Sequence, residues 1–269
     1  MTPPRRTAVA EGSRAAGDVA PLLSVRGLSK RFGGVRAVDG IDLDVQPHET
    51  VALIGPNGAG KTTFYNLLSG RMQPTTGTVV FDGRDVTGLA PHEISRLGIS
   101  RSFQITNIFP ELTARENVEV ALTAVHGRAL RLFSRAAADS ALHEEADALL
   151  ARLGLVALAT TRAGTLSYGD KRLLEIAIVL ATRPRLVLLD EPTAGMTPEE
   201  TRGVVELVRQ LAASTQYTFL ITEHDMEVVF GLADRIVVLH RGRVLAQGSA
   251  DEIRASREVR EAYLGEPDD

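Results

Sequence analysis

The sequence predicts an α/β protein built around a parallel β-sheet, and two features support this prediction. The first is a strand–loop–helix unit, in which the apolar run 51–54 precedes a glycine-rich loop and residues 63–68 begin a helix. The second is the apolar run 186–189, which ends in two carboxylates. Buried strands of a parallel sheet end in this way where the sheet presents ligand-binding groups at its C-terminal edge.

The glycine-rich loop has the pattern of a phosphate-binding loop, because it fits G-x-x-x-x-G-K-[ST] between its strand and its helix. Glycines let successive backbone N–H groups point inward, and the helix N-terminus adds partial positive charge, so the backbone itself binds polyphosphate. A glycine-rich turn that binds nothing would not account for both flanks. We expect Lys61 to reach the outer phosphates and Thr62 to ligate magnesium. The predicted nucleotide contacts in the loop are Gly55, Asn57, Gly58, Gly60, Lys61, Thr62 and Thr63.

The carboxylates that end the second apolar run are Asp190 and Glu191. Asp190 is suited to hold the magnesium shell, and Glu191 to polarise a water for in-line attack on the terminal phosphate. Taken alone, such a pair of carboxylates is at least as consistent with a solvated strand end as with a catalytic site. Together with the phosphate loop, it predicts a nucleotide-hydrolysing site.

Between these elements, Ser167 and Gly169 stand just before the apolar helix 173–181, a second helix N-terminus suited to an anion. An ordinary N-capping serine is the alternative. The segment 166–172 resembles the signature motif of ATP-binding cassette (ABC) proteins, usually Leu-Ser-Gly-Gly-Gln, and the order of the three motifs fits that family. In that family the signature of one subunit covers the ATP held by another. The implied ATP contacts in trans are Ser167, Tyr168 and Gly169.

The signature departs from its usual form at two positions. Tyr168 replaces the first glycine, and Asp170 replaces the glutamine. A carboxylate beside a phosphate is repulsive unless Lys171 or Arg172 offsets its charge, so no phosphate contact is assigned to Asp170.

The ABC resemblance assigns roles to three further residues. Gln104 matches the glutamine that joins magnesium and the attacking water to a helical subdomain, and His224 matches the switch histidine at the terminal phosphate. Phe32 matches the aromatic residue that stacks on adenine. Taken alone, they would be a loop glutamine, a surface histidine and a core phenylalanine. The implied catalytic residues are Glu191, His224 and Gln104, and the implied magnesium ligands are Thr62, Gln104 and Asp190.

The domain organisation that follows is a P-loop NTPase fold of the ABC nucleotide-binding type. It has a parallel core sheet, an antiparallel β layer and an inserted helical subdomain at about 105–182. Residues 22–26 and 41–45 are predicted as edge strands of the antiparallel layer, and the two apolar stretches 235–239 and 243–248 as a hairpin. Residues 1–21 are predicted to be a disordered tail, and 22–269 one ABC ATPase domain.

Composition favours a soluble cytoplasmic subunit rather than a complete transporter, and the ABC resemblance implies that it is a peripheral subunit at the cytoplasmic face of the plasma (inner) membrane. The chain has 269 residues, 44% of them hydrophobic, and no apolar run that approaches the roughly 20 residues needed to cross a bilayer. The absence of cysteine fits a reducing compartment, and the net charge of −4 gives no reason to expect nucleic acid as a partner. The basic segment 126–135 is as consistent with a solvated turn as with a surface for a membrane subunit or lipid headgroups.

The signature, the segment 194–201 and the ending 259–265 are similar to the larger ATPase of branched-chain amino acid importers. The resemblance implies ATP and Mg²⁺ as cofactors. It implies as partners a second ABC ATPase, transmembrane permease subunits and, indirectly, a periplasmic or extracellular solute-binding protein. ATPases of urea and short-amide importers and of lipopolysaccharide export are alternatives. Two alternatives come from other functional classes. One is a cytosolic ATPase for DNA repair, cluster assembly or ribosome work, and the other is a regulatory module that binds ATP without hydrolysing it.

Overall fold

The computed structural model describes residues 20–102, 108–125, 136–214 and 216–264 of the chain. Gln104, the basic segment 126–135 and nearly all of the predicted N-terminal tail therefore lie outside the described residues. None of the helices in these described ranges combines the length and the apolar character that a membrane-spanning helix needs.

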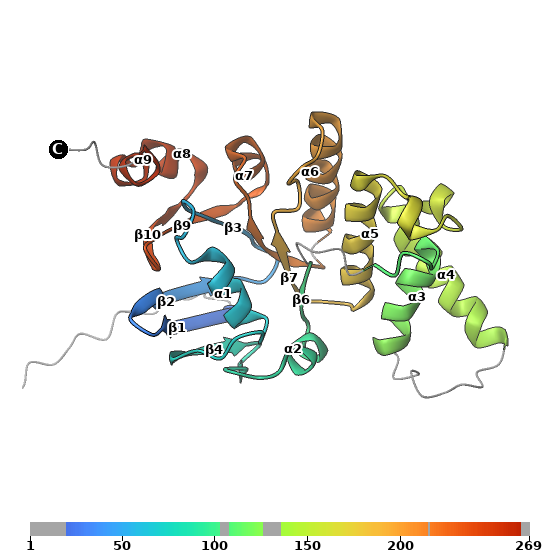
Figure 1. The fold of residues 1–269 in the computed structure, drawn as a ribbon, viewed down its shortest axis with the longest axis horizontal. Coiled ribbons are helices and arrows are strands. Elements are labelled where there is room, and N and C mark those ends of the chain that lie inside the picture. Colours follow the sequence, from blue (N-terminus) through green and yellow to red (C-terminus); the bar gives the residue numbers. More distant parts are fainter. Residues whose placement is uncertain (1–19, 103–107, 126–135, 215, 265–269) are drawn as a thin grey trace, which may run out of the picture.

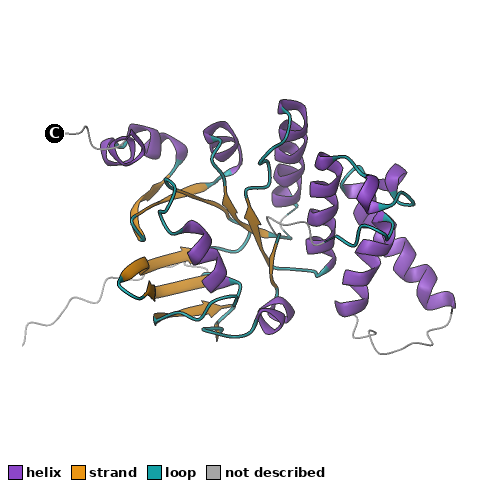
Figure 2. Ribbon diagram, viewed as in Figure 1, coloured by secondary structure: helices purple, strands orange, loops and turns teal. Residues whose placement is uncertain are grey.

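The centre of the molecule is a six-stranded sheet with the strand order β10-β9-β3-β8-β7-β6 (Figures 1 and 2). The pairs β9–β3, β3–β8, β8–β7 and β7–β6 are parallel, and only β10 runs antiparallel to its neighbour. Every residue of β3, β7 and β8 is buried, as expected for parallel strands covered on both faces. The strands are β3 (Thr50–Ile54), β6 (Ile99–Arg101), β7 (Leu186–Asp190), β8 (Thr218–Thr222), β9 (Arg235–His240) and β10 (Arg243–Gly248).

A four-stranded antiparallel sheet lies beside the central one, with the order β2-β1-β4-β5. The antiparallel layer and the β9–β10 hairpin predicted from the sequence are thus confirmed. The prediction that residues 22–26 form an edge strand was wrong, because β1 pairs with both β2 and β4 and continues to Phe32. The strands are β1 (Leu23–Phe32), β2 (Val35–Val45), β4 (Thr76–Phe81) and β5 (Arg84–Asp85).

Helix α1 (Lys61–Leu68) lies between the two sheets (Figure 1). Its Phe64 and Tyr65 are fully buried in a core shared with Val25 of β1, Leu53 of β3 and Leu188 of β7. This packing holds the first turn of α1 at the C-terminal edge of the central sheet, which is where the predicted phosphate loop ends.

A second core joins the helical part of the chain to the other face of the central sheet. Leu122 of α3, Leu150 of α4 and Leu174 of α5 belong to it, together with Val187 of β7 and Phe219 of β8. The helices expected between residues 105 and 182 are present, while the division of the chain into a core and a subdomain stays a prediction. The helices are α2 (Pro91–Leu97), α3 (Ala114–Val125), α4 (Ala136–Arg152), α5 (Tyr168–Ala181), α6 (Pro198–Ala213), α7 (Met226–Leu232), α8 (Ala250–Ala255) and α9 (Arg257–Leu264).

Candidate functional site

Three segments that the sequence predicts to act together emerge at one edge of the central sheet. Because β3, β7 and β8 are parallel, the phosphate loop, the acidic pair and the segment leading to His224 all follow strand ends on the same side. In the strand register, Thr222 at the end of β8 is paired with Leu53 of β3 on one side and with Asp190 of β7 on the other. The fold therefore places the loop and the carboxylates on either side of one strand.

The phosphate loop needs its glycines for space as well as for backbone conformation. Gly55, Gly58 and Gly60 have φ angles of 152°, 79° and 105°, which side-chain-bearing residues rarely adopt. A Cβ on Gly55 would overlap the carbonyl oxygen of Leu239, and one on Gly60 that of Ala37. Gly60 is also the N-cap of α1 and provides no side-chain cap, so the backbone N–H groups of the first turn face the loop.

Lys61, the first residue of α1, folds back into the loop. Its Nζ donates to the Gly55 carbonyl at 2.5 Å and to the Pro56 carbonyl at 3.3 Å. The side chain is almost entirely buried, and desolvation lowers the pKa of its ammonium group, an effect that the charges of Glu191 and Asp190 oppose. Among the other side chains predicted to contact the nucleotide in this loop, Asn57 and Thr62 are exposed, and Thr63 is half-buried.

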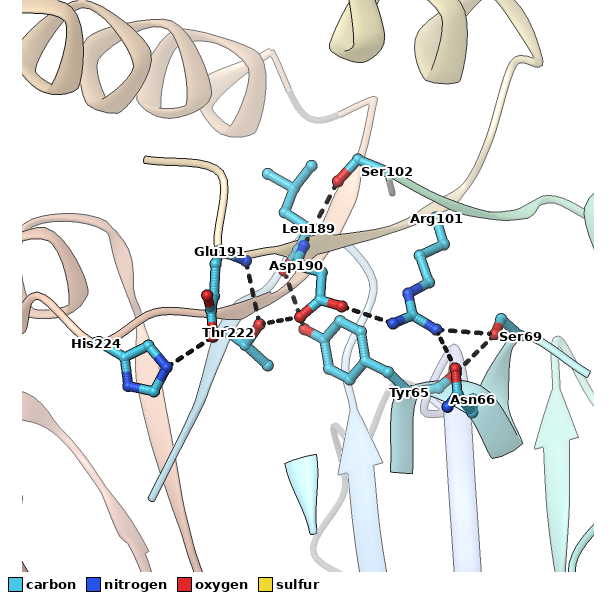
Figure 3. Close-up of polar contacts among 10 residues, drawn as sticks. All are labelled: Tyr65, Asn66, Ser69, Arg101, Ser102, Leu189, Asp190, Glu191, Thr222 and His224. Atoms are coloured by element: carbon cyan, nitrogen blue, oxygen red, sulfur yellow. Dashed lines mark hydrogen bonds and ion pairs between the residues drawn. The ribbon is translucent and has the colours of Figure 1, made fainter. Parts of the chain in front are cut away.

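Asp190 is buried and bound on both of its carboxylate oxygens (Figure 3). Oδ1 accepts the hydroxyl of Thr222 at 2.7 Å, and Oδ2 accepts Nη2 of Arg101 at 2.6 Å. The other half of the Arg101 guanidinium binds Asn66 Oδ1 on α1 at 2.7 Å. Sequence reasoning assigned no role to Arg101, although a charged residue that ends a buried strand is a signal that such reasoning can use.

Glu191 and His224 touch each other at this edge. The Nε2 atom of His224 lies 2.6 Å from Oε1 of Glu191 (Figure 3). Glu191 has a φ of 49°, an uncommon conformation for a residue with a side chain, and its N–H is held by the Thr222 carbonyl at 3.0 Å. The local fold thus turns the glutamate away from the strand direction and toward His224.

Glu223, which sequence reasoning missed, is a buried carboxylate that joins the two strand ends. It accepts the backbone N–H of Thr193 at 2.9 Å and its hydroxyl at 2.8 Å, and the N–H of His224 at 3.3 Å. Burial raises the pKa of this carboxyl, and the bonds from Thr193 and His224 oppose the rise. Its position directly after a buried strand and beside His224 was the available signal.

The signature segment forms the N-terminus of α5. Ser167 is the N-cap, and its Oγ accepts the N–H of Asp170 at 3.1 Å while donating to Asp170 Oδ2 at 2.6 Å. The carboxylate of Asp170 is thus turned toward the serine of its own cap. Neither of the predicted cations pairs with it: Lys171 binds the Gly164 carbonyl, and Arg172 forms a buried pair with Glu175.

The signature also contacts the loop after β7 and the first turn of α6. The hydroxyl of Tyr168 donates to the Ala194 carbonyl at 3.0 Å, and a Cβ on Gly169 would overlap the carboxylate of Glu200. In Figure 1, α5 lies between α6 and the α3–α4 pair, whereas α1 lies among the strands. One chain therefore does not bring its own signature and phosphate loop together, as the expected contact in trans requires.

Phe32 ends β1, and 47% of its surface is exposed, so it is not a core phenylalanine. Lys30 Nζ lies 5.4 Å from the centre of its ring. The exposed face is compatible with the predicted stacking on a base.

The residues present fit a magnesium–nucleotide complex. The loop has the backbone conformation and the lack of Cβ atoms that close approach of phosphates needs. The candidate metal ligands, the Thr62 hydroxyl and the Asp190 carboxylate, offer the oxygen atoms that Mg²⁺ prefers. No group of three or more His, Cys, Asp or Glu that would hold a metal occurs among the described residues.

The fold and the site define the chain as a nucleotide-binding cassette. The family model described as "ABC transporter" matches residues 38–194, and the chain belongs to the ABC transporter family. A second model, described as "Branched-chain amino acid ATP-binding cassette transporter", matches residues 243–269.

Relatives and solved structures agree with this membership. The chain is 43% identical over 251 residues to the high-affinity branched-chain amino acid transport ATP-binding protein LivG of Escherichia coli K12, covering 91% of this chain and 98% of that protein. It is 43% identical over 259 residues to BraF of Pseudomonas aeruginosa, with the same coverage. The crystal structure of an ABC transporter cassette in its ADP conformation matches with a TM-score of 0.81 at 30% identity, covering 92% of this chain and all of that one. A nucleotide-free cassette matches with a TM-score of 0.80 at 30% identity, covering 91% and 100%.

Proposed function

We propose that this chain is a Mg²⁺-dependent ATPase that drives the import of branched-chain amino acids through separate transmembrane subunits. The observation that carries the ATPase part is the contact between Glu191 and His224 at the sheet edge that also bears the phosphate loop. The names of the relatives carry the transport part, and they favour branched-chain amino acids over urea, short amides or lipopolysaccharide.

In the proposed reaction, the loop from Gly55 to Thr63 binds the ATP phosphates, and Lys61 moves from its backbone carbonyls to the outer phosphates. Bound Mg²⁺ would neutralise charge on the terminal phosphates. Glu191 accepts a hydrogen bond from the attacking water, and His224 holds the glutamate and contacts the terminal phosphate. Gln104, which lies outside the described residues, is assigned to the same metal and water by the ABC resemblance alone.

Two copies of the cassette, or this chain and a sister subunit, would enclose two ATP molecules between phosphate loop and signature. A terminal phosphate bound by groups of both chains gives the closed dimer a higher ATP affinity than the open one. Only such a difference in affinity is able to drive a conformational change. The helical subdomain at about 105–182 would pass the motion to permease subunits at the cytoplasmic face of the membrane, with a solute-binding protein on the other side.

Phosphate release by the purified chain tests the ATPase. Glu191→Gln is expected to bind ATP, to lose turnover by about 10²-fold or more, and to accumulate as an ATP-bound dimer in light scattering. Glu199→Gln is the matched control, because Glu199 is an exposed glutamate of α6 whose ion pair is with Arg202. Normal turnover by Glu191→Gln would remove the assignment, and wild-type chain that binds ATP without releasing phosphate would favour the regulatory module.

Affinity capture from mild detergent extracts of native membranes tests the transport part. We expect two multi-span permease subunits, a sister ATPase and a periplasmic amino-acid receptor to co-purify. Lipopolysaccharide-transport proteins, or soluble partners only, would contradict the importer while leaving the ATPase standing.

A further inference from the structure

The guanidinium of Arg101 bridges the metal-binding carboxylate and the phosphate-loop helix. Arg101 is the last residue of β6 and is bound to Asp190 at 2.6 Å and to Asn66 of α1 at 2.7 Å (Figure 3). The ring of Tyr65 lies beneath it, 5.4 Å from the guanidinium carbon to the ring centre. The side chains of Arg101 and Asp190 are each only 6% exposed, so little solvent screens this pair.

Both oxygens of Asp190 are therefore engaged by groups of the chain itself, Arg101 on one and Thr222 on the other. A Mg²⁺ ion, or a water of its shell, needs one of these oxygens. A Mg²⁺ ion beside this carboxylate and the guanidinium of Arg101 would repel each other, and the buried surroundings screen that repulsion little. Each carboxylate oxygen keeps a second lone pair for the metal or its water, but the repulsion between the two cations weakens the hydrogen bond from Arg101 as the metal binds.

Arg101 has other contacts that would hold it in that event. Asn66 binds the second Nη atom, Ser69 Oγ lies 3.5 Å from the same atom, and the Tyr65 ring gives a cation–π contact. The guanidinium is thus able to give up the carboxylate without becoming a buried cation with no partner. This distinguishes the arrangement from a purely structural ion pair, whose two members depend on each other.

We propose that Arg101 is a positioning residue that competes with Mg²⁺ for Asp190 and so sets how much Mg²⁺ the site requires. This inference rests on the proposed Mg²⁺-dependent nucleotide site. It assigns Arg101 two opposite effects: the residue stabilises the chain without Mg²⁺–nucleotide and weakens the binding of the metal.

The test is a Mg²⁺ titration of purified chain with a fixed concentration of fluorescent ADP, starting in EDTA, with urea unfolding in EDTA alongside. Arg101→Met is expected to unfold at lower urea than wild type, because it leaves Asp190 buried without its counter-ion. Its half-saturating Mg²⁺ concentration should nevertheless be lower by about tenfold or more, since the competing charge-assisted hydrogen bond is gone. Arg101→Lys keeps the charge and should stay within about twofold of wild type.

A matched control is Arg235→Met, which removes another arginine–carboxylate pair of the same sheet. Arg235 binds Glu49 at 2.7 Å, and the two lie at the opposite end of the strands from the phosphate loop. The control should lower the urea midpoint and leave the Mg²⁺ requirement unchanged. If Arg101→Met is not recovered folded, Arg101→Gln replaces it, with the same direction expected.

The outcomes separate the inference from the function on which it rests. An Arg101→Met chain whose Mg²⁺ requirement is unchanged or increased overturns the competition while leaving the nucleotide site in place. Wild-type chain that shows no Mg²⁺-dependent nucleotide binding overturns the proposed function and this inference with it. A lower requirement in Arg101→Met, with near-normal behaviour of Arg101→Lys and Arg235→Met, supports the competition.

Discussion

Gly60 is a position in the phosphate loop where a single added methyl group should be costly, and Gly58 nearby offers a matched comparison. Its φ is 105°, and a Cβ there would overlap the Ala37 carbonyl oxygen. Gly58 shares the positive φ, at 79°, but has nothing within 4 Å of the Cβ position. Gly60→Ala and Gly58→Ala therefore share the backbone cost and differ in the steric one.

The structure sets the size of the difference. Placing alanine at a positive φ costs about 1–3 kcal/mol. Pushing aside a packed backbone carbonyl adds about 1–3 kcal/mol, the usual cost of overpacking. Gly58→Ala should thus lose about 1–3 kcal/mol of unfolding free energy and Gly60→Ala about 2–6 kcal/mol. Because Gly60 is also the N-cap of α1, its displacement should weaken nucleotide binding by about tenfold or more.

Urea unfolding without nucleotide measures the first quantity, and titration with fluorescent ADP and Mg²⁺ the second. Gly83→Ala is the control for backbone cost alone, since Gly83 has a φ of 74°, lies in a turn between β4 and β5 and has nothing near its Cβ position. It should lose stability as Gly58→Ala does and keep full nucleotide affinity. Equal losses of stability in Gly58→Ala and Gly60→Ala would refute the steric argument.

Two further outcomes follow from exposure and burial at the site. Phe32→Ala should raise the KM for ATP by about tenfold with little change in stability, because an exposed ring stacked on a base contributes about 1–3 kcal/mol to binding. Steady-state kinetics would measure this KM, with Val35→Ala as the control, because Val35 is an exposed neighbour of Phe32 across the hairpin. The same KM in both variants would contradict the stacking. For Glu223, whose pKa burial raises, the folded chain holds a proton more tightly than the unfolded one, so this group's contribution to stability falls as pH rises through the raised pKa. Glu223→Gln removes that contribution, and the wild-type-minus-variant difference in urea unfolding free energy should decline with rising pH; a flat difference would contradict it.

The parts of the fold and site that could be predicted from the sequence are those that depend on residues close together in the chain. The strand, loop and helix around Gly55–Lys61 and the acidic end of β7 each lie within one short segment, so periodicity and residue type were enough to place them. Strand order could not be predicted in this way. β1 is an inner strand of its sheet because β4 pairs with it, and nothing within residues 22–26 encodes that pairing.

For the same reason, contacts between side chains of distant segments could not be predicted from the sequence. Arg101 and Asp190 are 89 positions apart, and only the parallel pairing of β6 with β7 brings them together. For a related reason, no partner could be assigned to Asp170 from the sequence. A charged residue three positions into a helix has the nearby cap as well as distant cations to choose from, and in the structure it binds its own cap, Ser167.

The charged groups that would meet Mg²⁺–ATP already have partners within the chain: Asp190 binds Arg101, Glu191 binds His224, and Lys61 binds backbone carbonyls. Binding of the nucleotide must therefore exchange partners, and the measured affinity is the net of contacts made and contacts given up. A residue that only supports the fold lowers both stability and affinity when it is removed. Removing a residue whose partner is taken over by the ligand lowers the stability of the chain but raises its affinity for the ligand. The signs of the two effects, measured on the same variant, separate the groups that hold this edge of the sheet together from those that the nucleotide displaces.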